Sequence, residues 1–210
     1  MFHVKQPPLD AAGFATVTAA TPAQVERLAA YLDLLNRWQH RVNLVGPATL
    51  ADPWRRHVLD SAQLVPLIPA AAESLVDLGS GAGFPGLVVA ILADVRVTLV
   101  ESDARKAAFL AEAARITATR AAIRVGRIES LSPEPADVVT ARALAPLPKL
   151  LEYAVKWLAP NGVCLFPKGR AVAGELTAAE RTWKMRRALL PSQTDREAAI
   201  LRIDGISRRA

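Results

Sequence analysis

The sequence is poor in the side chains that build disulfides and metal centres. Of its 210 residues one is cysteine and three are histidine, so a disulfide within the chain and a cluster of cysteine ligands are both excluded. Cys164 lies in the apolar run G-V-C-L-F, which predicts a buried thiol in a reducing compartment. His3 and His40 have no partner at the spacing of metal ligands, and we predict no metal site.

Long apolar runs are also missing. The longest, Leu87 to Ala93, is far too short to cross a bilayer, and the amino terminus lacks the basic-then-apolar pattern of a signal peptide. We therefore expect a cytoplasmic protein that is not embedded in a membrane.

Lysine is scarce, whereas alanine and arginine are abundant, and the net charge of +6 gives a pI near 10.0. A basic protein suits an anionic partner, nucleic acid first of all, although coding bias toward arginine accounts for part of this charge. A hydrophobic fraction of 51% excludes wholesale disorder, and the length allows one domain of ordinary size with a short extension.

The most informative stretch runs from Val76 to Gly86 and reads V-D-L-G-S-G-A-G-F-P-G. The apolar run from Ser74 to Leu78 leads into it and the helix-period run L-V-V-A-I-L-A follows, which predicts a strand, a tight turn and a helix. Glycine takes positive φ angles and lets a ligand approach the backbone, so we predict a cofactor-binding loop. Pro85 suits the first turn of the helix, whose start should offer free N–H groups.

Two cofactors compete for this loop. The segment G-A-G-F-P-G also satisfies the dinucleotide fingerprint. Asp77, two residues before Gly79, ends the first strand where a carboxylate can reach a cationic amine, which S-adenosylmethionine has and a nicotinamide dinucleotide lacks there. Glu101 ends the next apolar run and suits the ribose hydroxyls of either cofactor. A glycine-rich turn with incidental acids is the less favoured interpretation.

Residues 1–72 are expected to form a helical extension that caps the nucleotide fold. Residues 1–20 are rich in proline and alanine and predict a loose arm or a short helix. Thr21-Pro22-Ala23-Gln24 is a capping box at a helix start, and apolar residues then recur every three or four positions as far as Trp38. A second helix is predicted from Asp52 to the prolines at 66 and 69.

From Ser74 onward, apolar runs alternate with helix-period segments. Strands are predicted at 74–78, 97–101, 122–125, 137–140, 163–166, 185–190 and 197–203, and helices at 87–93, 103–119, 147–158 and 174–184. This order predicts an α/β fold, with a Rossmann-like, doubly wound and mostly parallel seven-stranded sheet over residues 73–210. The ligand site then belongs at the carboxyl ends of the strands, where residues 77–86, 101–103, 127–129 and 140–146 converge.

Several segments resemble the bacterial RsmG (GidB) family of small-subunit rRNA guanine-N7 methyltransferases, which are class I S-adenosylmethionine-dependent methyltransferases. The resemblance extends from about Tyr31 to about Arg170. Its marks are R-W-Q-H-R-V-N-L-V at 37–45, R-H-V-L-D-S at 56–61, the glycine-rich stretch at 76–86, A-R-A-L-A-P-L at 141–147 and P-K-G at 167–169. It implies S-adenosylmethionine as cofactor and 16S rRNA in the small ribosomal subunit as substrate, and we expect a monomer.

The resemblance also implies roles for individual residues. Gly79 and Phe84 contact the methyl donor, Ile128 and Glu129 flank its adenine, and Arg142 lies beside its methionine end. Together with the loop and strand-end residues argued above, the predicted cofactor site consists of Asp77, Gly79, Gly81, Gly83, Phe84, Glu101, Ile128, Glu129 and Arg142.

Arg142 is the candidate catalytic residue. It ends the fourth strand in the segment T-A-R-A-L-A-P, where many amino-directed methyltransferases have Asn/Asp-Pro-Pro-aromatic. Guanine N7 carries an in-plane lone pair and no proton, so attack on the sulfonium methyl needs no general base, and catalysis reduces to alignment and exclusion of water. Arg142 can hold guanine O6 or a phosphate. A structural ion pair with a carboxylate such as Asp77 competes with this role.

Two other functions stay open. A non-catalytic RNA- or ribosome-binding protein on the same fold would normally have lost Asp77, Glu101 or the glycines, and all are present. An NAD(P)-dependent reductase would need a proton donor, and Tyr153 and Lys156 are three positions apart instead of the four of a short-chain reductase helix.

Polar residues outside this site have structural interpretations. His57 and Asp60 predict a hydrogen-bond cluster between cap and domain in preference to a metal site, and Asn43 is expected to fix the loop under the cap. A group of basic residues near the carboxyl terminus could meet phosphates but is more typical of a solvated face: Arg181, Lys184, Arg186, Arg187, Arg202, Arg208 and Arg209.

Overall fold

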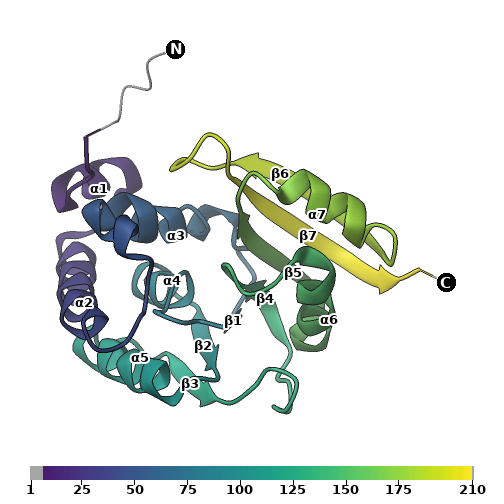
Figure 1. Cartoon of the computed structure of the whole chain (residues 1–210), viewed down its shortest axis with the longest axis horizontal. Coiled ribbons are helices and arrows are strands. Elements are labelled where there is room, and N and C mark those ends of the chain that lie inside the picture. Colours follow the sequence, from purple (N-terminus) through teal and green to yellow (C-terminus); the bar gives the residue numbers. More distant parts are fainter. Residues whose placement is uncertain (1–6, 210) are drawn as a thin grey trace.

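The computed structural model describes residues 7–209 and begins with helices (Figure 1). Helix α1 (Ala11–Thr18) confirms a short helix in the first segment, whereas residues 1–6 of the predicted arm, with His3, lie outside the described residues. In α2 (Pro22–Gln39) the Thr21 hydroxyl accepts from the Gln24 N–H, and the Gln24 side chain accepts from the Thr21 N–H at 2.9 Å. The predicted capping box is therefore confirmed.

The second predicted helix is confirmed from Trp54 to Ala62, where the π-helical η2 (Trp54–Leu59) continues directly into one turn of α3 (Asp60–Ala62). It ends before the predicted prolines, because Pro66, in the 3₁₀ turn η3 (Val65–Leu67), lacks the N–H that would continue it. A separate 3₁₀ turn, η1 (Pro47–Ala51), precedes it. Wide π-turns are frequent at functional sites.

Seven strands form one sheet in the order β3-β2-β1-β4-β5-β7-β6. Strands β1 to β5 run parallel, and β7 lies antiparallel between β5 and β6. The predicted doubly wound, mostly parallel sheet is confirmed. The strands are β1 (Ser74–Leu78), β2 (Arg96–Glu101), β3 (Ala122–Val125), β4 (Ala136–Thr140), β5 (Leu158–Lys168), β6 (Trp183–Pro191) and β7 (Ala199–Arg208).

Four helices connect these strands: α4 (Gly86–Leu92), α5 (Ala104–Ile116), α6 (Leu147–Trp157) and α7 (Val172–Ala179). Helix α7 ends well before Lys184, so the predicted end of that helix is wrong. The chain turns into β6 at Trp183, whose side chain is buried in the apolar cluster of α6 and α7. Within residues 7–209, no helix is both long and apolar enough to cross a membrane.

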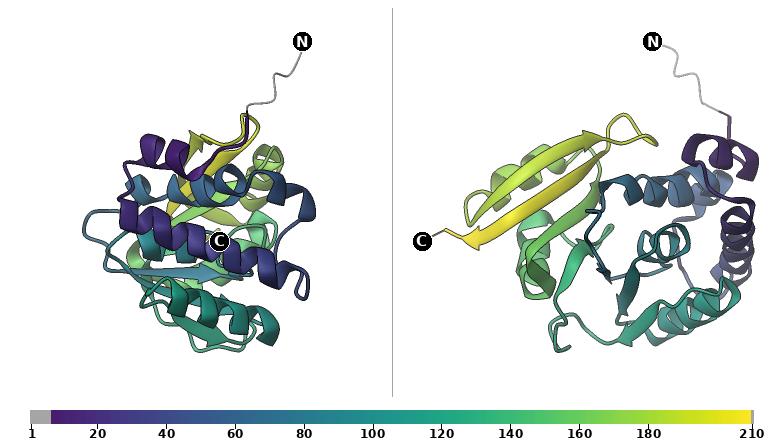
Figure 2. Two further views of the ribbon diagram at one scale, coloured as in Figure 1. Left: turned by 90° about the vertical axis from the view of Figure 1, so that its left-hand side faces the viewer. Right: turned by 180° about the vertical axis from the view of Figure 1, so that it is seen from behind.

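The core occupies both faces of the sheet. Successive residues of a strand point to opposite faces, so Leu75 packs in one apolar cluster with α4, α5 and the amino-terminal helices, and Val76 packs in another with α6 and α7. In the right-hand view of Figure 2, the purple helix α2 and the yellow strand β7 lie at opposite ends of the molecule, and the turn between β6 and β7 reaches toward α1. Because those helices share their cluster with the sheet, they form a further layer of one core, and a domain boundary at residues 72 and 73 stays a prediction.

Candidate active site

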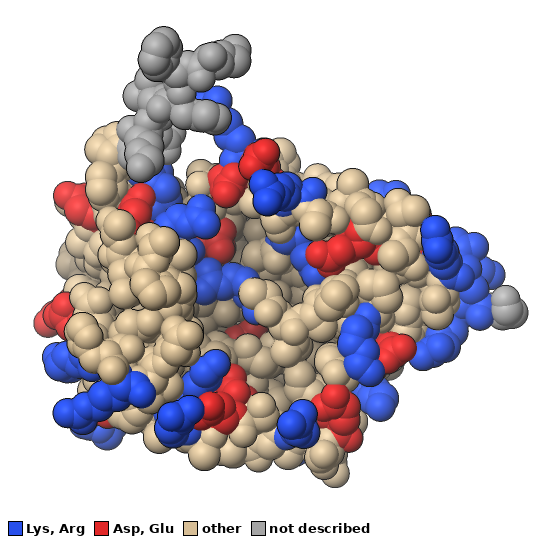
Figure 3. Space-filling model, viewed as in Figure 1, with Lys and Arg blue, Asp and Glu red and all other residues tan. Residues whose placement is uncertain are grey.

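Two adjoining pockets lie at the carboxyl edge of the parallel strands, where the sequence places the ligand. The larger has a volume of about 800 Å³ and the smaller about 330 Å³. Both are lined by Gly79, Gly81, Ala143 and Leu144, so they meet at the glycine-rich loop. Figure 3 shows this face hollowed between the amino-terminal helices and β5–β7, with side chains of both charges around the hollow.

The glycines of the loop serve two purposes: some face the pockets, and others allow the loop to pack closely against the core. Gly79, Gly81 and Gly83 all have positive φ angles, of 67°, 56° and 92°. A Cβ on Gly81 would meet no side chain within 4 Å, whereas one on Gly83 would lie 2.8 Å from the Tyr31 hydroxyl. A Cβ on Gly86 would lie 2.5 Å from Leu99. Gly79 and Gly81 therefore face the pockets, and Gly83 and Gly86 allow the loop to pack; the predicted contact of Gly83 with the cofactor stays a prediction.

Asp77 is fully buried beneath the loop and lines neither pocket. Its carboxylate accepts hydrogen bonds from the Thr140 hydroxyl at 2.8 Å and from the Gly86 N–H at 3.3 Å. Burial raises the pKa of Asp77 to about 6, against the opposing effect of these hydrogen bonds. The carboxylate thus ties β1, β4 and the start of α4 together, and its predicted contact with a ligand amine stays a prediction.

Two N–H groups at the start of α4 are already bonded and are not the free groups that we expected. The Gly86 N–H binds Asp77, and the Leu87 N–H donates to the Gly83 carbonyl at 2.7 Å. Ligand binding at the loop must therefore use other groups than these two amides.

Glu101 lies at the junction of the loop and the smaller pocket. Its two carboxylate oxygens accept from the Gly81 N–H at 2.7 Å and the Asp103 N–H at 2.8 Å. Each oxygen has a second lone pair, so the group can hold the loop and still accept from a ribose hydroxyl. Ile128 and Glu129 line the same pocket, where Glu129 accepts from the Tyr153 hydroxyl at 2.6 Å.

Phe84 forms part of the wall of the larger pocket although its side chain is buried. Tyr31 packs against one part of it with ring centroids 5.1 Å apart, and the imidazole of His57 stacks on it at 4.8 Å. The guanidinium carbon of Arg142 lies 5.1 Å from the centre of the same ring. Phe84 is thus both a core residue and the surface on which Arg142 rests.

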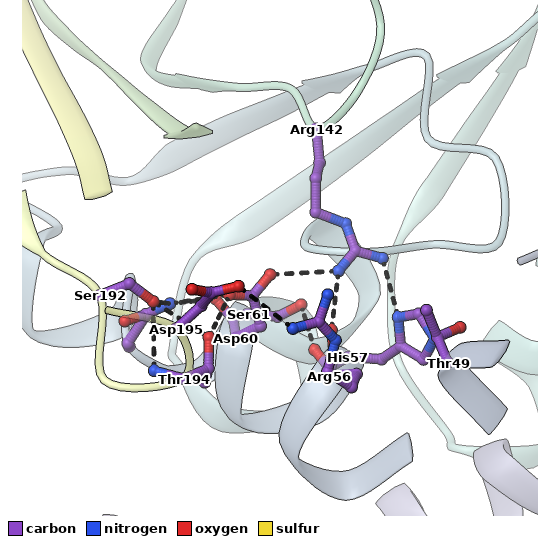
Figure 4. Close-up of polar contacts among 10 residues, drawn as sticks. Thr49, Arg56, His57, Asp60, Ser61, Arg142, Ser192, Thr194 and Asp195 are labelled. Carbon is purple, nitrogen blue, oxygen red and sulfur yellow. Dashed lines mark hydrogen bonds and ion pairs between the residues drawn. The ribbon is translucent and has the colours of Figure 1, made fainter. Parts of the chain in front are cut away.

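Arg142 is held by the helical segment at 56–60 (Figure 4). Its Nη1 donates to Asp60 Oδ2 and to the Arg56 carbonyl, both at 3.2 Å, and its Nη2 lies 3.1 Å from His57 Nδ1. The ion pair of the structural alternative is therefore present, but the carboxylate that pairs with Arg142 is Asp60 and not Asp77. The next residue, Ala143, has a φ of 53°, and such strain in a residue other than glycine is typical of functional sites.

The hydrogen bonds of His57 fix its tautomer. The Thr49 hydroxyl donates to the Gly46 carbonyl at 2.6 Å, so its oxygen accepts from His57 Nε2–H at 2.8 Å. Nδ1 then carries no proton and accepts from Arg142. Burial, followed by the charges of Arg142 and Arg56, lowers the pKa of His57 to about 3, so the ring is neutral. In the part of the chain that the structure describes, no three His, Cys, Asp or Glu side chains gather as a metal site.

The loop at 43–46 is held by a residue that the sequence analysis missed. Gln39 Oε1 accepts from the N–H groups of Leu44 and Val45 at 3.0 Å, and its Nε2 donates to the Val45 carbonyl at 2.8 Å. Asn43 is exposed and only accepts a long hydrogen bond, of 3.4 Å, from Gln39. Gln39 is the last residue of α2, and a glutamine where the chain leaves a helix can bind both the N–H and the C=O groups of the loop that follows. Its position was the available signal.

The β6–β7 hairpin also reaches the larger pocket through Thr194 and Asp195. The sequence did not predict this contact between the hairpin and the pocket, because Thr194 and its partner Asp60 are 134 positions apart. Several of the basic residues near the carboxyl terminus pair with acids: Arg186 and Arg202 with Asp204, Arg187 with Glu180 and Arg208 with Glu152. These pairs support the interpretation of a solvated face.

The family profile described as rRNA small subunit methyltransferase G (GidB) matches residues 24–197. The chain belongs to this family. The ribosomal RNA small subunit methyltransferase G of Rhodospirillum rubrum is 53% identical over 195 residues, which are 93% of this chain and 97% of that protein. Its counterpart from Paramagnetospirillum magneticum is 52% identical over 193 residues, 92% of this chain and 94% of that protein.

Solved structures support the fold. A TehB-like SAM-dependent methyltransferase from Corynebacterium glutamicum superposes with a TM-score of 0.56 at 17% identity, covering 83% of this chain and 97% of that one. TYW2 of M. jannaschii, in complex with AdoMet, gives a TM-score of 0.52 at 14% identity, covering 72% and 77%. With the family assignment, the predicted class I methyltransferase fold is confirmed, and the reductase alternative is not supported.

Proposed function

We propose that this member of the RsmG (GidB) family transfers a methyl group from S-adenosylmethionine to N7 of a guanine in 16S rRNA. When bound, S-adenosylmethionine supplies the electrophilic methyl group. Glu101, Ile128 and Glu129 in the smaller pocket would hold its adenosine half, and the open backbone at Gly81 leaves space where the pockets meet. The larger pocket would take the target base.

The proposal of N7 as the acceptor rests on one observation, the pairing of the acidic side chains that line the larger pocket with cations. Three carboxylates line it, and each is paired with a cation: Asp60 with Arg142 at 3.2 Å, Glu175 with Lys168 at 2.7 Å and Asp195 with Arg56 at 3.4 Å. His57 accepts from Arg142 and is neutral. Removal of a proton from an amine or a hydroxyl would need a free base, whereas the lone pair of guanine N7 needs none.

Arg142 would act by aligning the substrate. Its guanidinium rests on Phe84 in the larger pocket and has a planar fork of donors, which suits guanine O6 or a neighbouring phosphate. Attack by N7 would form one N–C bond while the bond between sulfur and the methyl group breaks and its electron pair stays on the sulfur of the leaving S-adenosylhomocysteine. No proton moves in this step, so alignment and exclusion of water account for the acceleration.

The substrate and the setting are part of the proposal. The substrate would be the small ribosomal subunit, and the protein would act as a cytoplasmic monomer. The helices of residues 1–72 would cap a catalytic unit of residues 73–210. The net charge of +6 supports an RNA partner.

The proposal is tested by methyl transfer in solution. Small subunits from a strain that lacks its own enzyme of this family are incubated with the purified protein and S-adenosylmethionine labelled in the methyl group. Nuclease digestion and mass spectrometry then identify the nucleoside that carries the label. We expect 7-methylguanosine. A label in an amino-methylated nucleoside would refute the N7 assignment, and no label in subunits or in free 16S rRNA would favour the non-catalytic alternative.

A further inference from the structure

Asp60 connects Arg142 to the β6–β7 hairpin. Its Oδ2 accepts from Arg142 Nη1 at 3.2 Å, and its Oδ1 accepts from the Thr194 hydroxyl at 2.8 Å and from Gln63 Nε2 at 3.0 Å. Figure 4 shows Arg142 and Thr194 approaching this carboxylate from different elements. The two oxygens of one side chain thus join the segment that follows β4, the helical segment at 54–62 and the hairpin.

The hairpin turn is tied down by further bonds beside Asp60. The Gln193 N–H donates to Gln63 Oε1 at 2.9 Å, Gln63 Nε2 lies 3.3 Å from Ser192 Oγ, and Arg56 pairs with Asp195 at 3.4 Å. These contacts place the turn against the helical segment next to the larger pocket. The carboxylate of Asp60 therefore has little freedom to rotate.

Arg142 has three polar contacts, and in only one of them, that with Asp60, is the partner charged. The Arg56 carbonyl is neutral, and His57 presents the bare Nδ1 of a neutral ring. The side chains of Arg142 and Asp60 are 20% and 18% exposed, so water screens this pair only partly. Charge-assisted hydrogen bonds are about twice as strong as neutral ones, and Asp60 thus contributes most to holding the guanidinium on Phe84.

We propose that Asp60 is a positioning residue for methyl transfer: it holds the guanidinium of Arg142 in the larger pocket, and the hairpin turn holds Asp60. This inference rests on the proposed function, since transfer to the small subunit is one of its readouts. Asp60 acts through Arg142 and needs no contact with substrate.

The first test is a double-mutant cycle. Asp60→Asn keeps the shape and an oxygen for Thr194 but removes the charge. We expect kcat to fall about tenfold to a hundredfold, the loss that one charge-assisted hydrogen bond accounts for, with little change in S-adenosylhomocysteine affinity. In an Arg142→Ala background, the same substitution should change kcat less than twofold. If the variant with both substitutions loses kcat by the product of the two single losses, the residues act independently and the inference is overturned.

Asp52→Asn is the matched control. Asp52 pairs with Arg55 at 3.0 Å at the start of the same segment, is 20% exposed, and lines neither pocket. It therefore reports what loss of a similarly buried ion pair does to the segment alone. We expect normal kcat in its folded fraction. A loss of kcat equal to that of Asp60→Asn would show that the effect is only structural and would overturn the inference.

The second test does not depend on activity. His57 Nδ1 accepts from Arg142, so its ¹⁵N resonance reports where the guanidinium lies. We expect the signal in Asp60→Asn to move toward that of Arg142→Ala, as Arg142 leaves the ring. An unchanged His57 signal would overturn the inference even if kcat fell. If the parent protein methylates no subunits, the proposed function fails on its own, and the His57 signal still decides whether Asp60 holds Arg142.

Discussion

The imidazole of His57 stacks on the ring of Phe84, with ring centroids 4.8 Å apart and an interplanar angle of 18°. This contact joins the amino-terminal helices to the glycine-rich loop at the edge of the larger pocket. Arg142 donates to His57 and lies over Phe84, so three segments far apart in the sequence meet at one place. The site is thus built as much by the helical extension as by the sheet.

Arg142→Ala should lower kcat/KM for the small subunit by about ten- to a hundred-and-fiftyfold, the equivalent of one charge-assisted hydrogen bond of about 1.5–3 kcal/mol. The variant also leaves Asp60 unpaired, so some loss of stability is expected, but a domain with about 5–15 kcal/mol of stability stays folded. Arg142→Lys should restore little activity, because an ammonium cannot reproduce the planar fork. Methyl transfer and thermal unfolding are measured on the same preparations. Near-normal activity in the folded fraction of an unstable variant would contradict the catalytic role.

His57 should make the protein less stable as the pH falls. The folded state keeps it neutral down to a pKa of about 3, whereas the unfolded chain takes up its proton near 6.5. Between these values the unfolded state binds more protons, so stability decreases on acidification, by about 2 kcal/mol from this residue at pH 5. In urea unfolding between pH 7 and pH 5, the parent should lose about 2 kcal/mol relative to His57→Gln, a comparison in which the opposing titration of Asp77 cancels. Equal losses in both proteins would be inconsistent with a buried neutral His57.

Asp77 should have the opposite effect. Its pKa is raised from 3.8 to about 6, so between these values the folded state binds more protons than the unfolded state. Stability from this residue therefore decreases as the pH rises through that window, by about 3 kcal/mol in total, and stays lost above it. Asp77→Asn lacks this titration. In urea unfolding, the parent should lose about 2.4 kcal/mol of this relative to the variant between pH 4 and pH 7. A constant difference would refute the raised pKa.

The two kinds of glycine in the loop should respond differently to substitution. Gly81→Ala adds a Cβ in open space at the pocket, so it should weaken S-adenosylmethionine binding while costing only the strain of a positive φ, about 1–3 kcal/mol. Gly83→Ala adds a clash with Tyr31 to that strain, so it should lower the melting temperature further. Calorimetric titration and thermal unfolding of both variants check this. Unchanged donor affinity in a folded Gly81→Ala would show that the loop face is assigned to the wrong ligand.

The sequence predicted the elements whose signals are local. The capping box at Thr21, the strand before the glycines and the alternation after Ser74 each depend on neighbouring residues, and each was found. The sequence could not show that Gly81 faces the pocket and Gly83 packs in the core, because both fit the same motif and differ only in what packs beside them.

The contacts of Arg142 could not be predicted for a different reason. They depend on a π-turn before Asp60 and on a positive φ at Ala143, and neither has a sequence signature in alanine-rich or arginine-rich segments. The sequence indicated that His57 and Asp60 would bridge cap and domain, which the contact with Arg142 bears out. It did not indicate the hairpin turn at Thr194, which closes the cluster from the other end of the chain.

The central claim is tested most directly by counting 7-methylguanosine in 16S rRNA inside cells. A strain with its own enzyme of this family deleted is supplied with this protein or with Arg142→Ala, and 16S rRNA from each is digested and analysed by mass spectrometry. We predict that the deletion removes one 7-methylguanosine per molecule, that this protein restores it, and that Arg142→Ala restores much less. If the deletion strain contains no more 7-methylguanosine after it is supplied with the folded parent protein than before, the account is contradicted.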